Sequence, residues 1–173
     1  MDRIDYDEFK RLLRSSHRAW HLERRDTYGV TSESEPLRRW LDGEPDDYAW
    51  HAEWLQFVRE STAAGIEVQR LRIVSEPHTD YTRWGMAIAP QNIKAGEDVR
   101  YLQRDRLEAH GIPVPEEDCW LLDDTVLVLS IFLDDGREGA YAREPDPALT
   151  GQYRAFRDAT WRLAVSAREY IAA

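Results

Sequence analysis

The sequence contains a single cysteine, Cys119, only two lysines and no long apolar run. One cysteine excludes an internal disulfide and a thiolate metal cluster, which fits a reducing compartment or an indifference to redox state. The longest apolar run, 126–133, is far shorter than the roughly 20 residues that span a membrane. Residues 1–30 also lack the apolar segment of a signal peptide. We therefore predict a cytoplasmic protein with no membrane partner.

Basic residues are also scarce, because the chain has 23 Lys and Arg against 33 Asp and Glu, a net charge of -10. Binding to nucleic acid through the phosphate backbone requires a basic surface, so we expect no direct nucleic-acid partner. The excess acid is concentrated in 31–60, with 8 acidic and 3 basic residues, and in 121–150, with 7 and 2. Arginines near 24–25 and 70–83 lie outside these blocks. The chain can therefore hold a local anion site, and its acidic blocks can dock on a basic partner.

The motifs of the common enzyme classes are missing from the sequence. The nine glycines form neither GxGxxG nor GxxxxGK[ST], which argues against a phosphate-binding loop, and no GxSxG marks a nucleophilic serine. His17 and His21 have the spacing of zinc ligands on a helix, but no HExxH pattern and no third ligand accompany them. We therefore predict no catalytic residue, no metal and no cofactor.

With 173 residues, of which 42% are hydrophobic, the chain is long enough for one domain with its own core. Apolar periodicity, proline and glycine predict helices over 5–16, 34–41, 46–64, 79–94, 104–110 and 145–170. Strands are predicted over 18–28, 66–74, 98–102 and 139–143, with a hairpin turn at 134–136. Residues 118–133 form either two strands joined at Asp123–Asp124 or one bent strand. This order is typical of an α/β (α+β) fold, so we expect a single domain over 1–173 with a mixed sheet flanked by helices.

Polar and aromatic side chains directly follow 66–74, the strand with the clearest alternation. In open α/β sheets, ligands bind in the crevice beyond the carboxyl ends of the strands. The candidate ligand-binding residues here are acids, bases, an anion-binding arginine and two rings able to stack: Glu76, His78, Asp80, Tyr81, Arg83 and Trp84. The structural alternative is that Asp80 caps a helix, Arg83 pairs with a carboxylate and Trp84 packs in the core.

Charged residues in strand 18–28 form a second candidate cluster. The alternation of a strand places His21, Glu23 and Arg25 on one face. A charged face on an interior strand is costly unless its charges are paired, so the strand either lies at an edge of the sheet or lines a cleft. In a cleft, Arg25 is the candidate anion-binding residue and Glu23 orients it. The alternative is that both residues form structural ion pairs.

Four segments carry a resemblance to a known family, and they span nearly the whole chain: AWHLERRDTYG (19–29), 35–60, 70–102 and WLLDD (120–124). In these segments the chain resembles an actinobacterial domain of unknown function. Members of that family are commonly encoded beside XRE-type helix-turn-helix regulators. The resemblance implies a regulatory protein that acts together with such a regulator, and it implies no reaction.

The order of elements carries a weaker resemblance, to one half of the phospholipase D-like fold. The elements concerned are strand 66–74, helix 79–94, strand 98–102 and an apolar strand that ends in Asp-Asp. The catalytic motif of that fold is HxKxxxxD. With either Asp123 or Asp124 at the aspartate position, the histidine and lysine positions hold other residues. The resemblance therefore implies the fold without phospholipase D chemistry.

Two functions are compatible with these observations. The first is a non-enzymatic regulatory protein that partners a helix-turn-helix regulator and senses a small anionic ligand in the cleft after 66–74. The second is a phosphodiesterase or nuclease-like hydrolase that uses the same cleft. In that case, His78 is the general base and Arg83 stabilises the developing negative charge. The missing catalytic motifs favour the first function.

Overall fold

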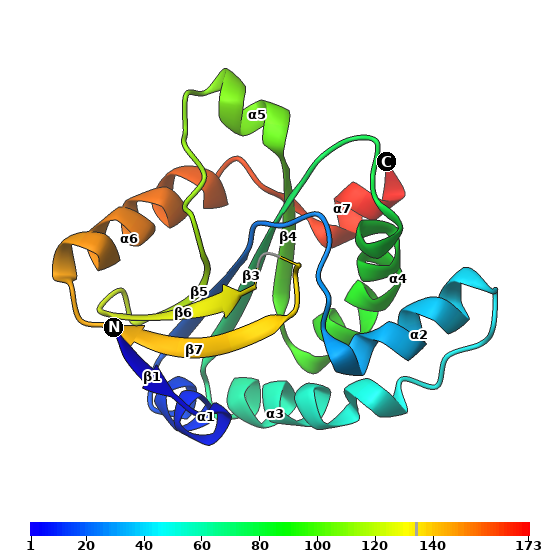
Figure 1. Ribbon diagram of the computed structural model, residues 1–173, viewed down its shortest axis with the longest axis horizontal. Helices are drawn as coiled ribbons and strands as arrows, with labels where there is room; N and C mark the ends of the chain where they lie inside the picture. Colours follow the sequence, from blue (N-terminus) through cyan, green and yellow to red (C-terminus); the bar gives the residue numbers. More distant parts are fainter. Residues whose placement is uncertain (134) are drawn as a thin grey trace.

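The computed structural model describes residues 1–133 and 135–173, and within them the chain forms one mixed sheet of eight strands (Figure 1). Their order across the sheet is β1-β7-β6-β5-β2-β3-β4-β8. The strands are β1 (Asp2–Ile4), β2 (Arg18–Glu23), β3 (Glu67–Val74), β4 (Asp98–Gln103), β5 (Asp118–Leu122), β6 (Val126–Phe132), β7 (Glu138–Glu144) and β8 (Val165–Ser166). The helices are α1 (Tyr6–Arg14), α2 (Thr31–Leu41), α3 (Ala52–Ala63), α4 (Asp80–Ala95), α5 (Arg104–Ala109), α6 (Pro147–Trp161) and α7 (Ala167–Ala172), with a short 3-10 helix, η1 (Ala49–His51), before α3. The predicted mixed sheet flanked by helices is confirmed.

The sheet has a parallel centre and antiparallel flanks. β2, β3 and β4 run parallel, with Arg18 opposite Glu67 and Gln69 opposite Asp98. From β2 outward, β5, β6, β7 and β1 are antiparallel to their neighbours, and β8 is antiparallel to β4. Parallel neighbours need long crossovers, which α2, α3 and α4 supply, whereas the antiparallel strands β5 and β6 are joined by a short turn.

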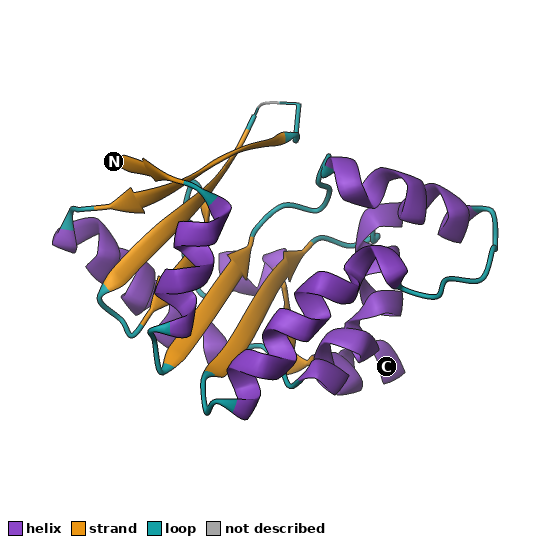
Figure 2. Ribbon diagram, turned by 90° about the horizontal axis from the view of Figure 1, so that it is seen from below, coloured by secondary structure: helices purple, strands orange, loops and turns teal. Residues whose placement is uncertain are grey.

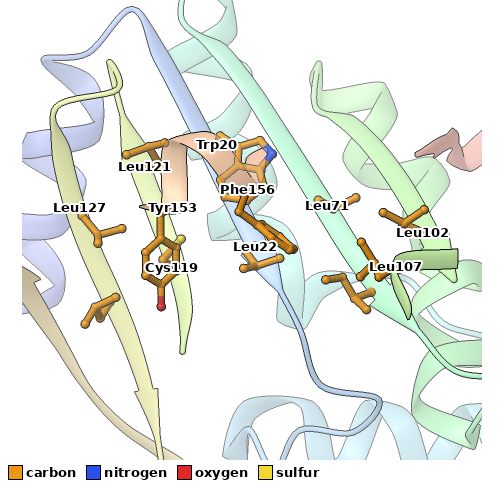
Figure 3. Close-up of a cluster of buried hydrophobic side chains, with 12 residues drawn as sticks. Trp20, Leu22, Leu71, Leu102, Leu107, Cys119, Leu121, Leu127, Tyr153 and Phe156 are labelled. Atoms are coloured by element: carbon orange, nitrogen blue, oxygen red, sulfur yellow. The ribbon is translucent and has the colours of Figure 1, made fainter. Parts of the chain in front are cut away.

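One face of the sheet is an apolar core beneath α5 and α6 (Figure 3). Trp20, Leu71 and Leu121 extend from the strands toward Tyr153 and Phe156 of α6. These five side chains are buried. Because these side chains are buried against α6 and exclude water from this face, they stabilise the fold.

The opposite face of the sheet is covered less evenly. α1 and α3 cover the amino-terminal half of β2 and β3, where Ala19 and Val68 pack against Phe9 and Phe57. α4 and α7 cover the edge near β4, and Figure 2 shows helices lying across the strands on this side. Beyond the apolar patch, the strands carry polar side chains such as Glu23. This polar half of the face holds the candidate site.

The strand predicted over 18–28 is shorter in the structure, because β2 ends at Glu23. The residues that follow form a loop bound to the loop after β3. Ser75 donates its backbone N–H to Asp26 Oδ1 at 2.7 Å, and Thr79 Oγ1 donates to the Asp26 carbonyl at 2.6 Å. β2 lies between β5 and β3, so the edge-strand alternative is wrong and the charges of β2 are interior.

The prediction of a single C-terminal helix over 145–170 is wrong, because this region contains α6, β8 and α7. α6 ends at Trp161, and β8 then pairs with the edge of β4, with Ser166 opposite Arg100. Ser166 also caps α7, because its Oγ accepts the Glu169 N–H at 3.3 Å. The apolar stripe of this region is compatible with one helix, and the strand forms because β4 offers an edge to pair with. The sequence also gave no indication of β1, and α2 and α3 begin at residues other than those predicted.

Residues 118–133 form two strands joined by Asp123 and Asp124, as one of the two alternatives predicts. Both residues have positive φ, 47° and 63°, the conformation required at the two central positions of a type I′ turn, which the Thr125 N–H closes by donating to the Leu122 carbonyl at 3.1 Å. Asp123 Oδ1 accepts the backbone N–H groups of His17 and Arg18 at 2.8 and 2.9 Å. These aspartates therefore have a structural role. The other predicted turn, at 134–136, includes Asp134, which lies outside the described residues.

Candidate ligand-binding pocket

A cavity of about 530 Å³ lies on the polar half of the sheet face that α1 and α3 partly cover. The strand register explains which side chains reach it, because residues directly opposite one another on neighbouring strands share a face. Two such rows line the cavity: Asp118, Ser130 and Tyr141 on β5, β6 and β7, and Arg70, His21 and Trp120 on β3, β2 and β5. Its volume is within the range of about 300–1,000 Å³ that is usual for small-molecule sites.

Aromatic rings form much of the cavity wall. The rings of His21 and Trp120 are stacked, with centroids 4.1 Å apart and planes 9° apart. Tyr28 packs against Phe132 at 4.9 Å and against Tyr81 at 5.5 Å. Because these rings support one another, they present fixed faces, and such walls suit a flat ligand.

A buried ionic cluster forms the floor of the cavity at the carboxyl ends of β2 and β3. The side chains of Glu23, Arg70 and Arg72 are only 12%, 9% and 12% exposed. Arg70 donates to Glu23 Oε1, and Arg72 Nε lies 2.7 Å from Glu23 Oε2. Burial by itself would raise the pKa of Glu23, but the two guanidinium groups lower it to about 2. Glu23 is therefore ionised at neutral pH and holds both arginines in place.

The ionic cluster continues away from Glu23 through buried polar groups. Arg70 Nε donates to Glu97 Oε1 at 2.6 Å, and Asn92 Nδ2 donates to Glu97 Oε2 at 2.7 Å. The same amide places its Oδ1 3.2 Å from His51 Nε2, and His51 lines the cavity. Burial lowers the pKa of His51, so its imidazole is mainly uncharged at pH 7. The cluster thus links the floor of the cavity to η1 and α4.

Two further carboxyl groups of the cavity, those of Asp118 and Glu33, form no ion pair among residues 1–133 and 135–173. Their basic neighbours act from a longer distance, Arg24 on Asp118 and the two arginines of β3 on Glu33. Asp118 Oδ1 accepts the Arg24 N–H at 2.9 Å, and Glu33 Oε2 accepts the Tyr81 hydroxyl at 2.5 Å. Burial raises the pKa of Asp118 to about 7 and also raises the pKa of Glu33. A cationic group placed between such carboxyls would stabilise their ionised forms.

Several polar atoms of the cavity wall are buried without a hydrogen-bond partner in the part of the chain that the structure describes. They are Ser130 Oγ, His21 Nδ1 and Trp54 Nε1. Burial and the nearby Arg70 lower the pKa of His21 to about 3, so its ring is neutral. An unpaired buried polar atom costs free energy, and a ligand that bonds to it recovers that cost.

No metal site emerges from this geometry. Within the two described ranges, no group of three His, Cys, Asp or Glu side chains is arranged to hold a metal ion. In the same ranges, no helix combines the length and the apolar character needed to cross a bilayer.

Of the eight candidate residues predicted from the sequence, Glu23 and Tyr81 line the cavity. The Arg25 guanidinium lies over the Phe132 ring, 5.5 Å from its centroid, and does not line the cavity. Trp84 is buried in the core and stacks against Trp50 at 5.3 Å. The structure therefore brings one residue of each predicted cluster to a shared cavity.

The remaining four candidates, Glu76, His78, Asp80 and Arg83, lie in the loop after β3 and the first turn of α4. Asp80 and Arg83 form an exposed ion pair. The two ring nitrogens of His78 lie 2.9 Å from the Ser75 carbonyl and 3.2 Å from the Tyr170 hydroxyl. The cap predicted for Asp80 is made by Thr79, whose side chain accepts the Thr82 N–H at 3.1 Å. None of the four is among the described residues that line the cavity with Glu23.

Residues that the sequence analysis did not single out form most of the pocket. Arg70, which lines the cavity, and Arg72 beside it carried a usable signal, because charged residues in an interior strand need buried partners. Asp118 carried a weaker signal as the first residue of an apolar strand. Glu33 carried none, because only the packing of α2 beside α4 brings it to Tyr81.

Comparison with models of known protein families identifies the family of the chain. The family model of a domain of unknown function, DUF6879, matches residues 7–172. The chain belongs to the DUF6879 family. A search of curated proteins gives no match. The resemblance to a domain of unknown function is thus confirmed, whereas the link to helix-turn-helix regulators and the phospholipase D-like resemblance stay predictions.

Proposed function

We propose that this member of the DUF6879 family is a non-enzymatic regulatory protein whose pocket senses a small molecule on behalf of a helix-turn-helix regulator. The cavity carries the ligand-binding part of the proposal, because it combines a suitable volume, aromatic walls and buried polar atoms without partners. The hydrolase alternative has less support. Its proposed base, His78, and its proposed anion clamp, Arg83, do not line this cavity.

The position of α2 offers a route from the pocket to the surface. Glu33 of α2 and Trp50 of η1 both line the cavity, yet α2 has no fully buried residue. A helix held by few buried contacts opens or shifts at low free-energy cost. A ligand that contacts Glu33 can therefore bias the position of α2 and of the surface it presents to a partner.

Charge supports association with a basic partner, although less strongly than composition alone implies. In the acidic block 31–60, Arg38 pairs with Glu35 and Asp42, and Arg39 pairs with Glu44. These internal ion pairs neutralise part of the block. The net charge of -10 still favours the approach of a basic DNA-binding protein.

Ligand capture tests the sensing part of the proposal. The purified protein is incubated with a bacterial metabolite extract, washed and denatured, and the released compounds are identified by mass spectrometry. We expect a compound that is enriched on the wild type and absent from Ser130→Phe, whose ring would project into the cavity and obstruct it. Ser34→Phe is the matched control, because Ser34 is exposed and does not line the cavity. Equal recovery from all three proteins would reject a ligand in this pocket.

The family resemblance predicts a helix-turn-helix regulator encoded beside the gene, and calorimetric titration with that regulator tests the partner. We expect a dissociation constant of about 10 μM or lower, and weaker binding at high salt if charge steers the encounter. No heat of binding at several times that concentration would reject the regulatory role while leaving ligand binding intact.

A further inference from the structure

The charges that line the cavity do not balance. Five acidic residues line it, Glu23, Glu33, Glu53, Asp118 and Glu138, but the only arginine or lysine among the described lining residues is Arg70. Glu23 is neutralised by Arg70 and Arg72, and Glu53 lies 3.6 Å from Lys10. Three carboxyl groups remain without an ion pair in the described part of the chain.

Histidine does not restore the balance. His21 and His51 line the cavity, but burial lowers the pKa of both imidazoles, so neither supplies positive charge at neutral pH. Arg70 does not supply free charge either, because Glu23 and Glu97 already engage it. An anion that enters the cavity would therefore face carboxyl groups, with no unpaired arginine or lysine among the described lining residues to bind it.

The aromatic walls add a second feature that attracts a cation. The faces of Trp, Tyr and Phe rings carry negative electrostatic potential and attract positive groups. Tyr28, Phe132 and Tyr81 form such a wall close to Glu33, whose carboxylate accepts the Tyr81 hydroxyl. Ser130, which is 7% exposed, adds a buried hydroxyl oxygen without a partner among the described residues. A hydroxyl oxygen can accept a hydrogen bond from an ammonium group.

We propose that the pocket binds a flat aromatic molecule that carries a positively charged amine. The ring of the ligand packs against the aromatic wall, and its ammonium group is attracted by the carboxyl groups of Glu33 and Asp118, which both line the cavity. This inference rests on the proposed ligand-binding function and names the chemical class of the ligand. It replaces the anion expected from the sequence, because Arg25 and Arg83 do not line the cavity, and Arg70, which does, is already paired with Glu23 and Glu97.

Three probes that share an indole ring and a two-carbon chain separate charge from shape: tryptamine is a cation, tryptophol is neutral and indole-3-propionate is an anion. Binding is measured by calorimetry at pH 7.5. We expect tryptamine to bind about tenfold more tightly than tryptophol, and indole-3-propionate to bind most weakly.

Two charge-removing variants locate the amine. Glu33→Gln and Asp118→Asn should each weaken tryptamine binding about fivefold and leave tryptophol binding unchanged. Glu35→Gln is the matched control, because Glu35 lies on the same helix as Glu33, is exposed and does not line the cavity. Circular dichroism verifies that each variant is folded. Since Glu33 lies on a helix without fully buried residues, Glu33→Gln keeps the test available even if Asp118→Asn misfolds.

The outcomes separate this inference from the proposed function. If all three probes bind equally and Ser130→Phe abolishes their binding, the pocket binds ligands, but its preference for a cationic ligand is refuted. A preference for tryptamine that survives Ser130→Phe would place the binding elsewhere and also overturn the inference. If no probe binds at about 1 mM, the aromatic amine is rejected, and metabolite capture by the wild type still decides whether the pocket holds another ligand.

Discussion

Replacing Glu23 with glutamine would remove the carboxylate that holds Arg70 and Arg72 together under the cavity. Arg70 would keep Glu97, but Arg72 would lose its only ion pair among residues 1–133 and 135–173. Removing one partner of a buried ion pair costs about 3–5 kcal/mol, because the remaining charge stays out of water. The pKa gives a similar magnitude. Its change from the ordinary value of 4.5 to about 2 corresponds to about 3 kcal/mol of stability at pH 7.

The direction of the pH dependence follows from the same pKa. Folding lowers the pKa of Glu23, so its contribution to stability is complete above pH 4.5 and is lost as the pH falls toward 2. The difference in unfolding free energy between wild type and Glu23→Gln should therefore be largest near pH 7. It should shrink as the pH falls through 4.5.

Urea unfolding followed by tryptophan fluorescence measures these differences. Glu97→Gln should cost less than Glu23→Gln, because it leaves Glu23 paired with both arginines. Glu35→Gln, which breaks an exposed pair with Arg38, should cost less than about 1 kcal/mol. Equal costs for the Glu23 and Glu35 variants, or a Glu23 effect that is constant down to pH 3, would refute the ionic cluster as a source of stability.

Two other positions give independent predictions. A Cβ atom at Gly85 would collide with a terminal nitrogen of Arg72, so Gly85→Ala should lower the unfolding free energy by about 1–3 kcal/mol. The same substitution should cost less unfolding free energy when Arg72 is already replaced by methionine. Urea titration of the double variant measures this, and a double-variant loss equal to the sum of the two single-variant losses would contradict the explanation. Folding raises the pKa of Asp118 from 3.8 to about 7, so wild-type stability should decline as the pH rises through this interval. Asp118→Asn should then be more stable than wild type near pH 8, by up to about 4 kcal/mol, and nearly as stable as wild type near pH 4. Thermal melting of both proteins across this pH range measures the difference. A difference that does not change with pH would show that Asp118 is not desolvated.

The fold was largely predictable because its main elements follow local patterns. β3 alternates apolar and polar residues, and α4 is capped by Thr79 before its first residue and by Gly96 after its last, so both elements lie close to their predicted ranges. β8 was not predictable, because two residues become a strand only where β4 offers its edge. The loop after β3 was predicted as the site on a general rule for α/β sheets. In this chain, the backbone of Asp26 binds that loop and Tyr81 alone of its candidates reaches the cavity.

The sequence by itself determined the class of fold, the alternation of helices and strands, the acidic balance and the family. These properties depend on composition, periodicity and long matching segments, all of which are local to the chain. Only the tertiary structure decided the pocket, because strand register brings Asp118 and Ser130 together and helix packing adds Glu33. It is also the basis for proposing a cationic ligand in place of an anionic one. The arginines of β3 are paired with buried glutamates, a pairing between distant segments that no local pattern specifies.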